Sequence, residues 1–233
     1  MTHRFFVDED TVERAVLRGD QAHQIANVLR LRPGGRITVV RNGIESVIAL
    51  ETVDAHEVQG RVVERRPVEA EPGVRLTLAI PILRGERTEQ VIAAVTQLGV
   101  SGIVPFVSAR SVVRELTAMK HERWRRIARE AAETSRRGRI PQIGERVGWE
   151  GLFDVLEPPI LVAWEGEPTR RLLDSVPEGG LTLVIGPEGG LAAAEVELAR
   201  ERGAVIVSLG RRNLRSETAA IAAVAQLMAA VER

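Results

Sequence analysis

Residues 76–231 alternate between short apolar runs and longer helical segments, and this alternation constrains the fold more than any other feature. Continuous apolar strands connected by helices are typical of a parallel sheet that helices cover on both faces. The predicted strands are Leu76–Ile80, Ile103–Val107, Ile160–Ala163, Leu181–Ile185 and Val205–Leu209, and the predicted helices are Thr88–Leu98, Thr117–Arg137, Ala192–Arg202 and Ser216–Val231. We expect Gly99, Gly138 and Gly203 to follow helix ends, where glycine readily takes a left-handed conformation.

The first 66 residues predict a small β-rich module instead. Asn42-Gly43 predicts a two-residue hairpin turn, because both central positions of such a turn need positive φ. Ile25, Val28 and Leu29 share one face of a helix predicted over Gln21–Leu31. The predicted strands are Arg4–Val7, Arg36–Arg41, Ile44–Leu50 and Val58–Val63. Modules of this kind bind RNA in some proteins and only support a neighbouring domain in others, and the fold alone favours neither role.

The polar segment Pro67–Gly73 is bounded by prolines and lacks periodicity, so it predicts a linker. We therefore expect two domains, residues 1–70 and residues 74–233.

The composition excludes several classes of protein. There are 32 basic and 32 acidic residues, so the net charge gives no overall attraction to nucleic acid or membranes. The absence of cysteine excludes disulfides and thiol catalysis, and the four histidines lack ligand spacing, so we expect no metal. No run approaches the roughly 20 apolar residues of a membrane helix, and no secretory leader is evident at the N-terminus, so we expect a cytoplasmic protein without a membrane partner.

Two loops that follow predicted strands carry the residues most suited to chemistry. In an open parallel sheet, ligands bind beyond the carboxyl ends of the strands. Gly186-Pro187-Glu188-Gly189-Gly190 follows one strand, and its glycines would let backbone amides approach a ligand at a helix N-terminus. It is neither a dinucleotide fingerprint nor a P-loop, and alone it could be a tight turn that binds nothing.

The second loop, Ser208–Ser216, follows the next strand and leads into the final helix. It holds three arginines, which is more than a connection needs. Glu217 could complement the helix dipole, and Ser216 could be the N-cap. Residues 219–231 are apolar around more than one helix face, so that helix is buried either in the core or against a second subunit.

These two loops together resemble one family, the 16S ribosomal RNA uridine N3-methyltransferases, commonly called RsmE, of the SPOUT superfamily. The resemblance rests on Ile185-Gly186-Pro187-Glu188-Gly189-Gly190 and on Leu209-Gly210-x-x-x-Leu214-Arg215-x-Glu217-Thr218-Ala219. It extends over essentially the whole chain. Further matches in the family's order are Arg4-Phe5-Phe6, His23 with Val28-Leu29-Arg30, Gln97-Leu98-Gly99-Val100, Pro105, Arg123-Trp124, Glu130-Ala131 with Ser135-Arg136, and Ile140-Pro141.

The resemblance implies a fold, a cofactor and partners. The implied fold class is α/β: a small N-terminal PUA-like β-barrel that binds RNA, followed by a SPOUT domain with a C-terminal trefoil knot. The implied assembly is a homodimer that acts on 16S ribosomal RNA of the small ribosomal subunit, and the implied cofactor is S-adenosylmethionine. The cofactor-binding residues that it implies are Ala163, Trp164, Glu165, Ile185, Gly186, Pro187, Glu188, Gly189, Gly190, Ser208, Leu209, Gly210 and Leu214.

Several positions depart from the family pattern. Arg87 stands where the family commonly has lysine, and Gln97 stands in its usual Glu-Leu-Gly. Thr134 and Asn213 also differ from the expected residues. These departures affect details of the pocket rather than the assignment.

Methylation of uracil N3 requires removal of an imide proton and alignment of the nitrogen with the sulfonium methyl group. Positioning and a dry pocket can supply much of the acceleration without a metal. Glu217 is the candidate acid/base, although it could only fix the loop, and Arg215 is the candidate for stabilising negative charge on the uracil oxygens. Arg136 completes the predicted catalytic set.

The predicted helix Thr117–Arg137 is rich in arginine, and residues 110–146 hold 11 basic and 5 acidic residues. A solvated face is the ordinary interpretation, and phosphate contact is the functional one. The predicted RNA contacts are Arg4, Arg30, Arg123, Arg126 and Arg137. Two alternatives stay open: methylation of another RNA position, such as a ribose hydroxyl, and an RNA-binding assembly factor without catalysis.

Overall fold

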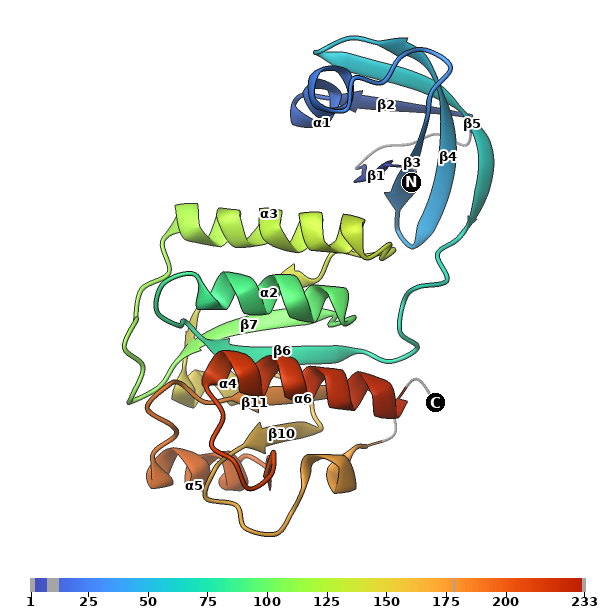
Figure 1. Cartoon of the computed structure of the whole chain (residues 1–233). Coiled ribbons are helices and arrows are strands. Elements are labelled where there is room, and N and C mark those ends of the chain that lie inside the picture. Colours follow the sequence, from blue (N-terminus) through green and yellow to red (C-terminus); the bar gives the residue numbers. More distant parts are fainter. Residues whose placement is uncertain (1–2, 8–12, 178, 232–233) are drawn as a thin grey trace. The chain divides into compact units, whose positions relative to one another are not determined.

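A computed structural model of the chain describes residues 3–7, 13–177 and 179–231. The chain forms two compact units, one comprising Met1–Glu71 with Ala132–Arg139 and the other Pro72–Ala131 with Ile140–Arg233. The segment Ala132–Arg139 falls within the predicted C-terminal domain, yet it clusters with the N-terminal residues. The architecture is mixed α/β, with a curled sheet in the first unit and a parallel sheet in the second (Figure 1).

The first unit is built on a five-stranded sheet in the order β1-β3-β4-β5-β2. Its strands are β1 (His3–Phe6), β2 (Arg14–Arg18), β3 (Arg36–Arg41), β4 (Ile44–Val53) and β5 (Glu57–Pro67). Asn42 and Gly43 connect β3 to β4 with φ angles of 50° and 78°, so the predicted hairpin turn is confirmed. The sequence analysis missed β2, since its five residues carry only a short alternation of buried and exposed side chains.

The curl of this sheet has a local cause in β4 and β5. Their pairing shifts register twice, between Val47 and Ile48 and between Leu50 and Thr52, and such bulges bend and twist strands. At the bend, a Cβ atom on Gly60 would lie 2.5 Å from the carbonyl oxygen of Ala49. Glycine therefore permits the close approach of the two strands.

The predicted helix Gln21–Leu31 is wrong in its extent and partly in its face. The structure has a short helix α1 (Asp20–His23) followed by a wider π-type turn η1 (Gln24–Val28), in which Leu29 N donates to Gln24 O at 2.8 Å. The extra residue in that turn rotates Val28 away from buried Ile25, and Val28 is 65% exposed.

The helix predicted to end at Arg137 ends earlier. Helix α3 (Ala118–Thr134) is followed by Arg136, which takes the left-handed φ of 61° that the sequence analysis expected at Gly138. Gly138 serves another purpose, because a Cβ atom there would lie 2.9 Å from Val68 and 3.1 Å from Gly43. Its carbonyl accepts the Gly43 N–H at 3.1 Å, which ties this segment to the hairpin turn of the same unit.

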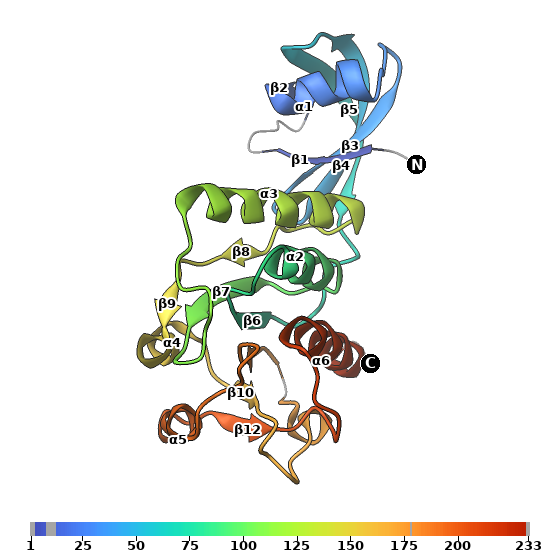
Figure 2. The same ribbon diagram turned by 60° about the vertical axis from the view of Figure 1, so that its left-hand side comes forward.

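The second unit is built on a parallel sheet in the order β12-β10-β11-β6-β7-β8, with β9 pairing to β7 (Figure 2). Its strands are β6 (Leu76–Pro81), β7 (Gly102–Val107), β8 (Gln142–Ile143), β9 (Val147–Gly148), β10 (Ile160–Ala163), β11 (Leu181–Ile185) and β12 (Val205–Val207). The predicted parallel sheet is confirmed. The sequence analysis missed β8 and β9, which are two residues long.

Helices cover both faces of this sheet, as predicted (Figure 1). One buried cluster joins the sheet to α2 (Arg87–Gln97), α3 and α6 (Ser216–Val231), and another joins it to α4 (Trp149–Val155) and α5 (Ala193–Glu201). The sequence analysis missed α4 and the short 3₁₀ helix η2 (Leu172–Ser175). Gly99 and Gly203 follow α2 and α5 with φ angles of 104° and 81°, so both predicted helix ends are confirmed.

Within the described ranges, no helix is long and apolar enough to cross a membrane. Within those same ranges, no three His, Asp or Glu side chains are grouped so that they could hold a metal ion.

Candidate functional site

The glycine loop after β11 is shaped by close contacts that exclude larger side chains. Gly190 has a φ of 71°, and a Cβ atom there would collide with the Glu165 carboxylate. A Cβ atom on Gly186 would lie 3.0 Å from Leu191 Cγ. Beyond the loop, the Glu195 carboxylate accepts the Ala192 N–H at 2.8 Å and thereby fixes the start of α5. The backbone of this loop is therefore held close to the carboxyl end of β11.

The loop after β12 is fixed through Ser208. Its backbone N–H donates to Arg170 O at 2.7 Å, and its carbonyl accepts the Leu172 N–H at 3.0 Å. Its hydroxyl accepts the Gly210 N–H at 3.2 Å, where Gly210 takes a φ of 113°. Ser208 thus joins the loop after β12 to the chain that follows β10.

The loop after β10 contributes an aromatic ring and a carboxylate. Trp164 N donates to Val207 O at 2.9 Å, which places this loop beside the end of β12. The half-buried Trp164 ring lies against Gly166, where a Cβ atom would come within 2.5 Å of it. Glu165 reaches Gly190, so the loops after β10 and β11 are in contact.

These three loops enclose a cavity of about 720 Å³ at the carboxyl ends of neighbouring strands. Every residue predicted to bind the cofactor lines it. The lining residues are Arg87, Ala163, Trp164, Glu165, Ile185, Gly186, Pro187, Glu188, Gly189, Gly190, Ser208, Leu209, Gly210, Arg211, Arg212, Asn213, Leu214, Arg215, Ser216 and Ala219. We call this space the loop cavity.

Carboxylates and guanidinium groups meet where α6 begins. Glu217 Oε1 lies 3.7 Å from Arg87 Nε, and Arg87 Nη1 lies 3.8 Å from Glu188 Oε1. Glu217 Oε2 is buried and has no hydrogen-bond partner among the residues that the structure describes. Ser216, suggested as an N-cap, is the first residue of α6, and its hydroxyl donates to Gly186 O at 2.8 Å. Of the predicted catalytic residues, Arg215 lines the loop cavity, whereas Glu217, in the first turn of α6, is not one of its lining residues.

Comparison with known proteins assigns the chain to a family. An RNA methyltransferase domain model matches residues 70–228. A relative named ribosomal RNA small subunit methyltransferase E, from Bacillus subtilis, is 32% identical, and the alignment covers 96% of this chain and 95% of that protein. The chain belongs to the ribosomal RNA small subunit methyltransferase E family.

Solved structures of similar proteins agree with this family. The structure of ribosomal RNA small subunit methyltransferase E from Neisseria gonorrhoeae, bound to S-adenosyl methionine, has a TM-score of 0.90 and 29% identity, with 98% of each chain covered. A methyltransferase from Legionella pneumophila, in complex with the cofactor SAM, has a TM-score of 0.90 and 28% identity, with 99% of this chain and 98% of that chain covered.

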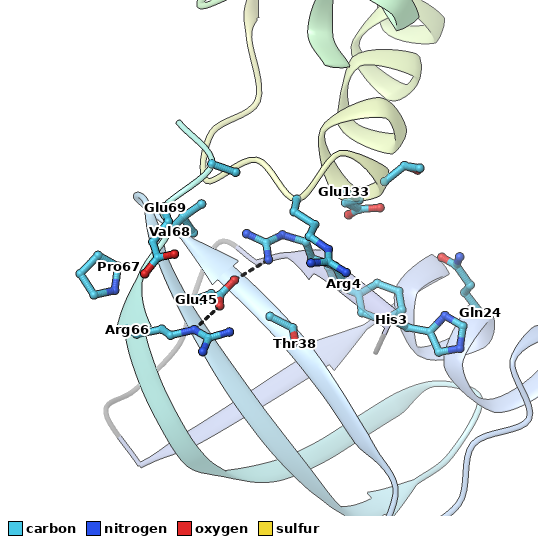
Figure 3. Close-up of a pocket in the computed structure, with 14 residues that line it drawn as sticks. His3, Arg4, Gln24, Thr38, Glu45, Arg66, Pro67, Val68, Glu69 and Glu133 are labelled. Atoms are coloured by element: carbon cyan, nitrogen blue, oxygen red, sulfur yellow. Dashed lines mark hydrogen bonds and ion pairs between the residues drawn. The ribbon is translucent and has the colours of Figure 1, made fainter. Parts of the chain in front are cut away.

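A second cavity, of about 710 Å³, lies within the first unit (Figure 3). Arg4 Nη1 lies 2.6 Å from Glu45 Oε2, and Arg66 Nε lies 2.5 Å from Glu45 Oε1. Burial raises the pKa of Glu45, but hydrogen bonds from Arg4 and Arg66 and their charges outweigh it, so the pKa lies below the ordinary value of 4.5. We call this space the ion-pair cavity.

Arg136, the remaining predicted catalytic residue, lines the ion-pair cavity and not the loop cavity. Arg4, a predicted RNA contact, has a side chain only 8% exposed and donates to Arg137 O at 3.0 Å. Arg137 is buried and bonds Glu71 through two nitrogens. Internal carboxylates hold Arg4 and Arg137, whereas Arg30 is exposed, and the RNA-binding roles of all three stay predictions.

The arginines of α3 are also paired, although they are more exposed. Arg123 Nη2 lies 2.6 Å from Glu89 Oε2 and 3.4 Å from Glu86 Oε1. Arg126 Nε lies 3.9 Å from Glu130 Oε1. Their predicted RNA contacts therefore compete with carboxylates of the same unit. The sequence analysis did not assign roles to Arg211 and Arg212, which line the loop cavity. Their position directly after Gly210, within the second family motif, was a visible signal.

Proposed function

We propose that this protein is an S-adenosylmethionine-dependent methyltransferase that methylates N3 of a uridine in 16S ribosomal RNA of the small ribosomal subunit. The observation that carries the proposal is the loop cavity, in which three separate loops gather every residue that the family motif predicts for the cofactor. The Bacillus relative is named for small-subunit ribosomal RNA methylation, and the Neisseria structure holds S-adenosyl methionine. Both support the proposal.

The residues of the loop cavity suit this cofactor. Backbone groups of Gly186–Gly190 and Leu209-Gly210 would hold its polar parts, because the glycines in these segments have no side chain to keep a ligand away from the backbone. Glu165 and Glu188 supply carboxylates for its positive groups. When bound, S-adenosylmethionine would supply a methyl group whose bond to the sulfonium sulfur breaks as the nucleophile attacks in line, so that the sulfur leaves as a neutral thioether.

Glu217 is the residue best placed to accept the imide proton. Its Oε2 atom is buried without a partner, and an unpaired buried acceptor costs free energy unless a ligand donates to it. In the proposed step, the proton leaves uracil N3 for Glu217 Oε2, and N3 gains the methyl group. Arg215 would stabilise the negative charge that develops on the uracil oxygens.

The finer features of the family are part of the proposal. These are a PUA-like barrel in the first unit, a trefoil knot in the second, a homodimer and a cytoplasmic site of action. Two features support the knot: β10 lies between β11 and β12, and Ser208 bonds to Arg170 and Leu172. The half-buried face of α6 at Ile221, Ala222 and Ala225 would suit a subunit interface. The catalytic role of Arg136 stays a prediction.

The test is mass spectrometry of 16S ribosomal RNA nucleosides from a strain in which the gene is deleted. We expect 3-methyluridine to disappear and to return when the gene is supplied on a plasmid. Unchanged 3-methyluridine would reject the proposed reaction, and loss of a ribose-methylated nucleoside instead would assign a different acceptor atom.

A further inference from the structure

Four arginines lie on the two loops beside the loop cavity. Arg170 and Arg171 follow β10 in sequence, Arg211 and Arg212 follow β12, and all four are exposed. Among the residues that the structure describes, none of these four guanidinium groups forms an ion pair within 4.0 Å. We call these four residues the rim arginines.

The two loops that carry the rim arginines are held side by side. The Ser208 N–H donates to Arg170 O, and Arg171 pairs with Ser208 in a parallel bridge. Arg211 and Arg212 follow Ser208 by three and four residues, and both line the loop cavity. The loops leave the neighbouring strands β10 and β12 (Figure 2), so the four arginines belong to adjacent loops.

The nearby carboxylates are engaged elsewhere. Glu167 Oε1 accepts the Thr169 N–H at 3.0 Å, the Thr169 hydroxyl at 2.9 Å and the Arg170 N–H at 3.0 Å. The backbone hydrogen bond from Arg170 is the largest cause that lowers the pKa of Glu167. The Glu165 carboxylate lies against Gly190, where a Cβ atom would collide with it. Glu217 Oε1 lies 3.7 Å from Arg87 Nε. The carboxylates therefore order the loops and leave the rim guanidinium groups available.

We infer that the rim arginines bind the phosphate backbone of the substrate RNA and bring its target nucleotide to the loop cavity. Guanidinium groups recognise phosphate oxygens in pairs, and exposed arginines without carboxylate partners lose no existing ion pair when they bind. The α3 arginines are the contrast, because each phosphate contact by Arg123 or Arg126 would replace a contact with glutamate. This inference rests on the proposed function, since it concerns the RNA that the enzyme methylates.

The test compares two double variants in the full-length protein. R211Q/R212Q removes two rim charges, and R123Q/R126Q removes two charges from α3 as the matched control. The probe is transcribed 16S ribosomal RNA, and its affinity is measured over a series of salt concentrations. For R211Q/R212Q we expect the slope of log affinity against log salt to fall by about 1.4, because each single-strand phosphate contact contributes about 0.7.

At physiological salt we expect R211Q/R212Q to bind this RNA roughly tenfold more weakly and R123Q/R126Q to bind within about twofold of wild type. In methylation assays the rim variant should show a raised KM for RNA with nearly unchanged kcat. Calorimetry with S-adenosylmethionine should give wild-type affinity for R123Q/R126Q and for R170Q/R171Q, whose residues lie outside the cavity lining, which controls for folding of the cavity. R170Q/R171Q changes residues outside the cavity lining and should weaken RNA binding and lower the salt slope in the same way.

An unchanged salt slope in both rim variants, or a larger loss in R123Q/R126Q, would overturn the inference. Failure of the proposed function looks different, because wild-type protein would then form no 3-methyluridine in the RNA. If wild-type protein is active and the rim variants match it, only the inference fails.

Discussion

The two cavities have nearly equal volumes, about 710 and 720 Å³, but their walls differ in kind. In the ion-pair cavity, Glu45 is held between Arg4 and Arg66, so opposite charges satisfy one another. In the loop cavity, glycine backbone forms much of the wall, and Arg211 and Arg212 form no ion pair with any residue that the structure describes. Charges that neutralise each other stabilise a fold, whereas charges left unsatisfied are available to a ligand.

The most severe test of this contrast is Glu217→Gln. We expect the single-turnover rate of methyl transfer to fall by about 10²–10⁴-fold, the usual contribution of a general acid or base. The amide keeps the size of the side chain but cannot take up the proton. Calorimetry of the same variant should show unchanged affinity for S-adenosylmethionine. A near-normal rate would show that Glu217 only fixes the loop.

Arg4→Gln tests the structural character of the ion-pair cavity. We expect the first unit to lose about 3–5 kcal/mol of stability, because the variant removes the buried partner of a largely buried carboxylate. Hydrogen exchange of β3 amides measures the loss. The control is Arg126→Gln, whose ion pair with Glu130 is exposed and should be worth about 0–1 kcal/mol. Equal effects would contradict the distinction between the cavities.

Gly190→Ala tests whether close backbone packing shapes the loop cavity. The substitution imposes about 1–3 kcal/mol of strain at positive φ and forces Glu165 aside. We expect affinity for S-adenosylmethionine to fall roughly 10- to 100-fold by calorimetry. Gly203→Ala is the matched control, because Gly203 also has positive φ but meets no atom within 4 Å. It should lower stability and leave cofactor affinity unchanged.

Lowering the pH gives the smallest expected effect, a loss of stability in the first unit through Glu45. The pKa of Glu45 is lowered in the folded protein, so its contribution to stability is present above about pH 4.5 and is lost as the pH falls through the lower folded pKa. We expect exchange of β4 amides to accelerate over that range. Glu45→Gln should remove this part of the pH dependence, and an unchanged profile would contradict the assignment.

Sequence patterns predict the second unit well because its strands are buried on both sides. Runs such as Leu181–Ile185 are buried at every position and almost entirely apolar, and glycines such as Gly203 mark helix ends. The first unit was harder to predict. The turn Gln24–Val28 depends on one unusual backbone hydrogen bond, and β2 is too short to give a periodic signal.

The candidate site shows a similar limit. Motif residues such as Gly186 and Leu209 came from the resemblance to the family, and both line the loop cavity. The ion pairs of the α3 arginines could not be predicted as readily, because the pairing of Arg123 with Glu89 joins two helices and depends on tertiary structure. The i,i+4 pair of Arg126 and Glu130 was visible in the sequence and already favoured a solvated face.

The central claim is that the loop cavity serves methyl transfer to uridine N3. The most direct measurement incubates the purified protein and methyl-labelled S-adenosylmethionine with small ribosomal subunits from the deletion strain, followed by mass spectrometry of the RNA nucleosides. The account predicts labelled 3-methyluridine with wild-type protein and greatly reduced label with Glu217→Gln. Labelled RNA without 3-methyluridine, or no labelled RNA at all, would contradict it.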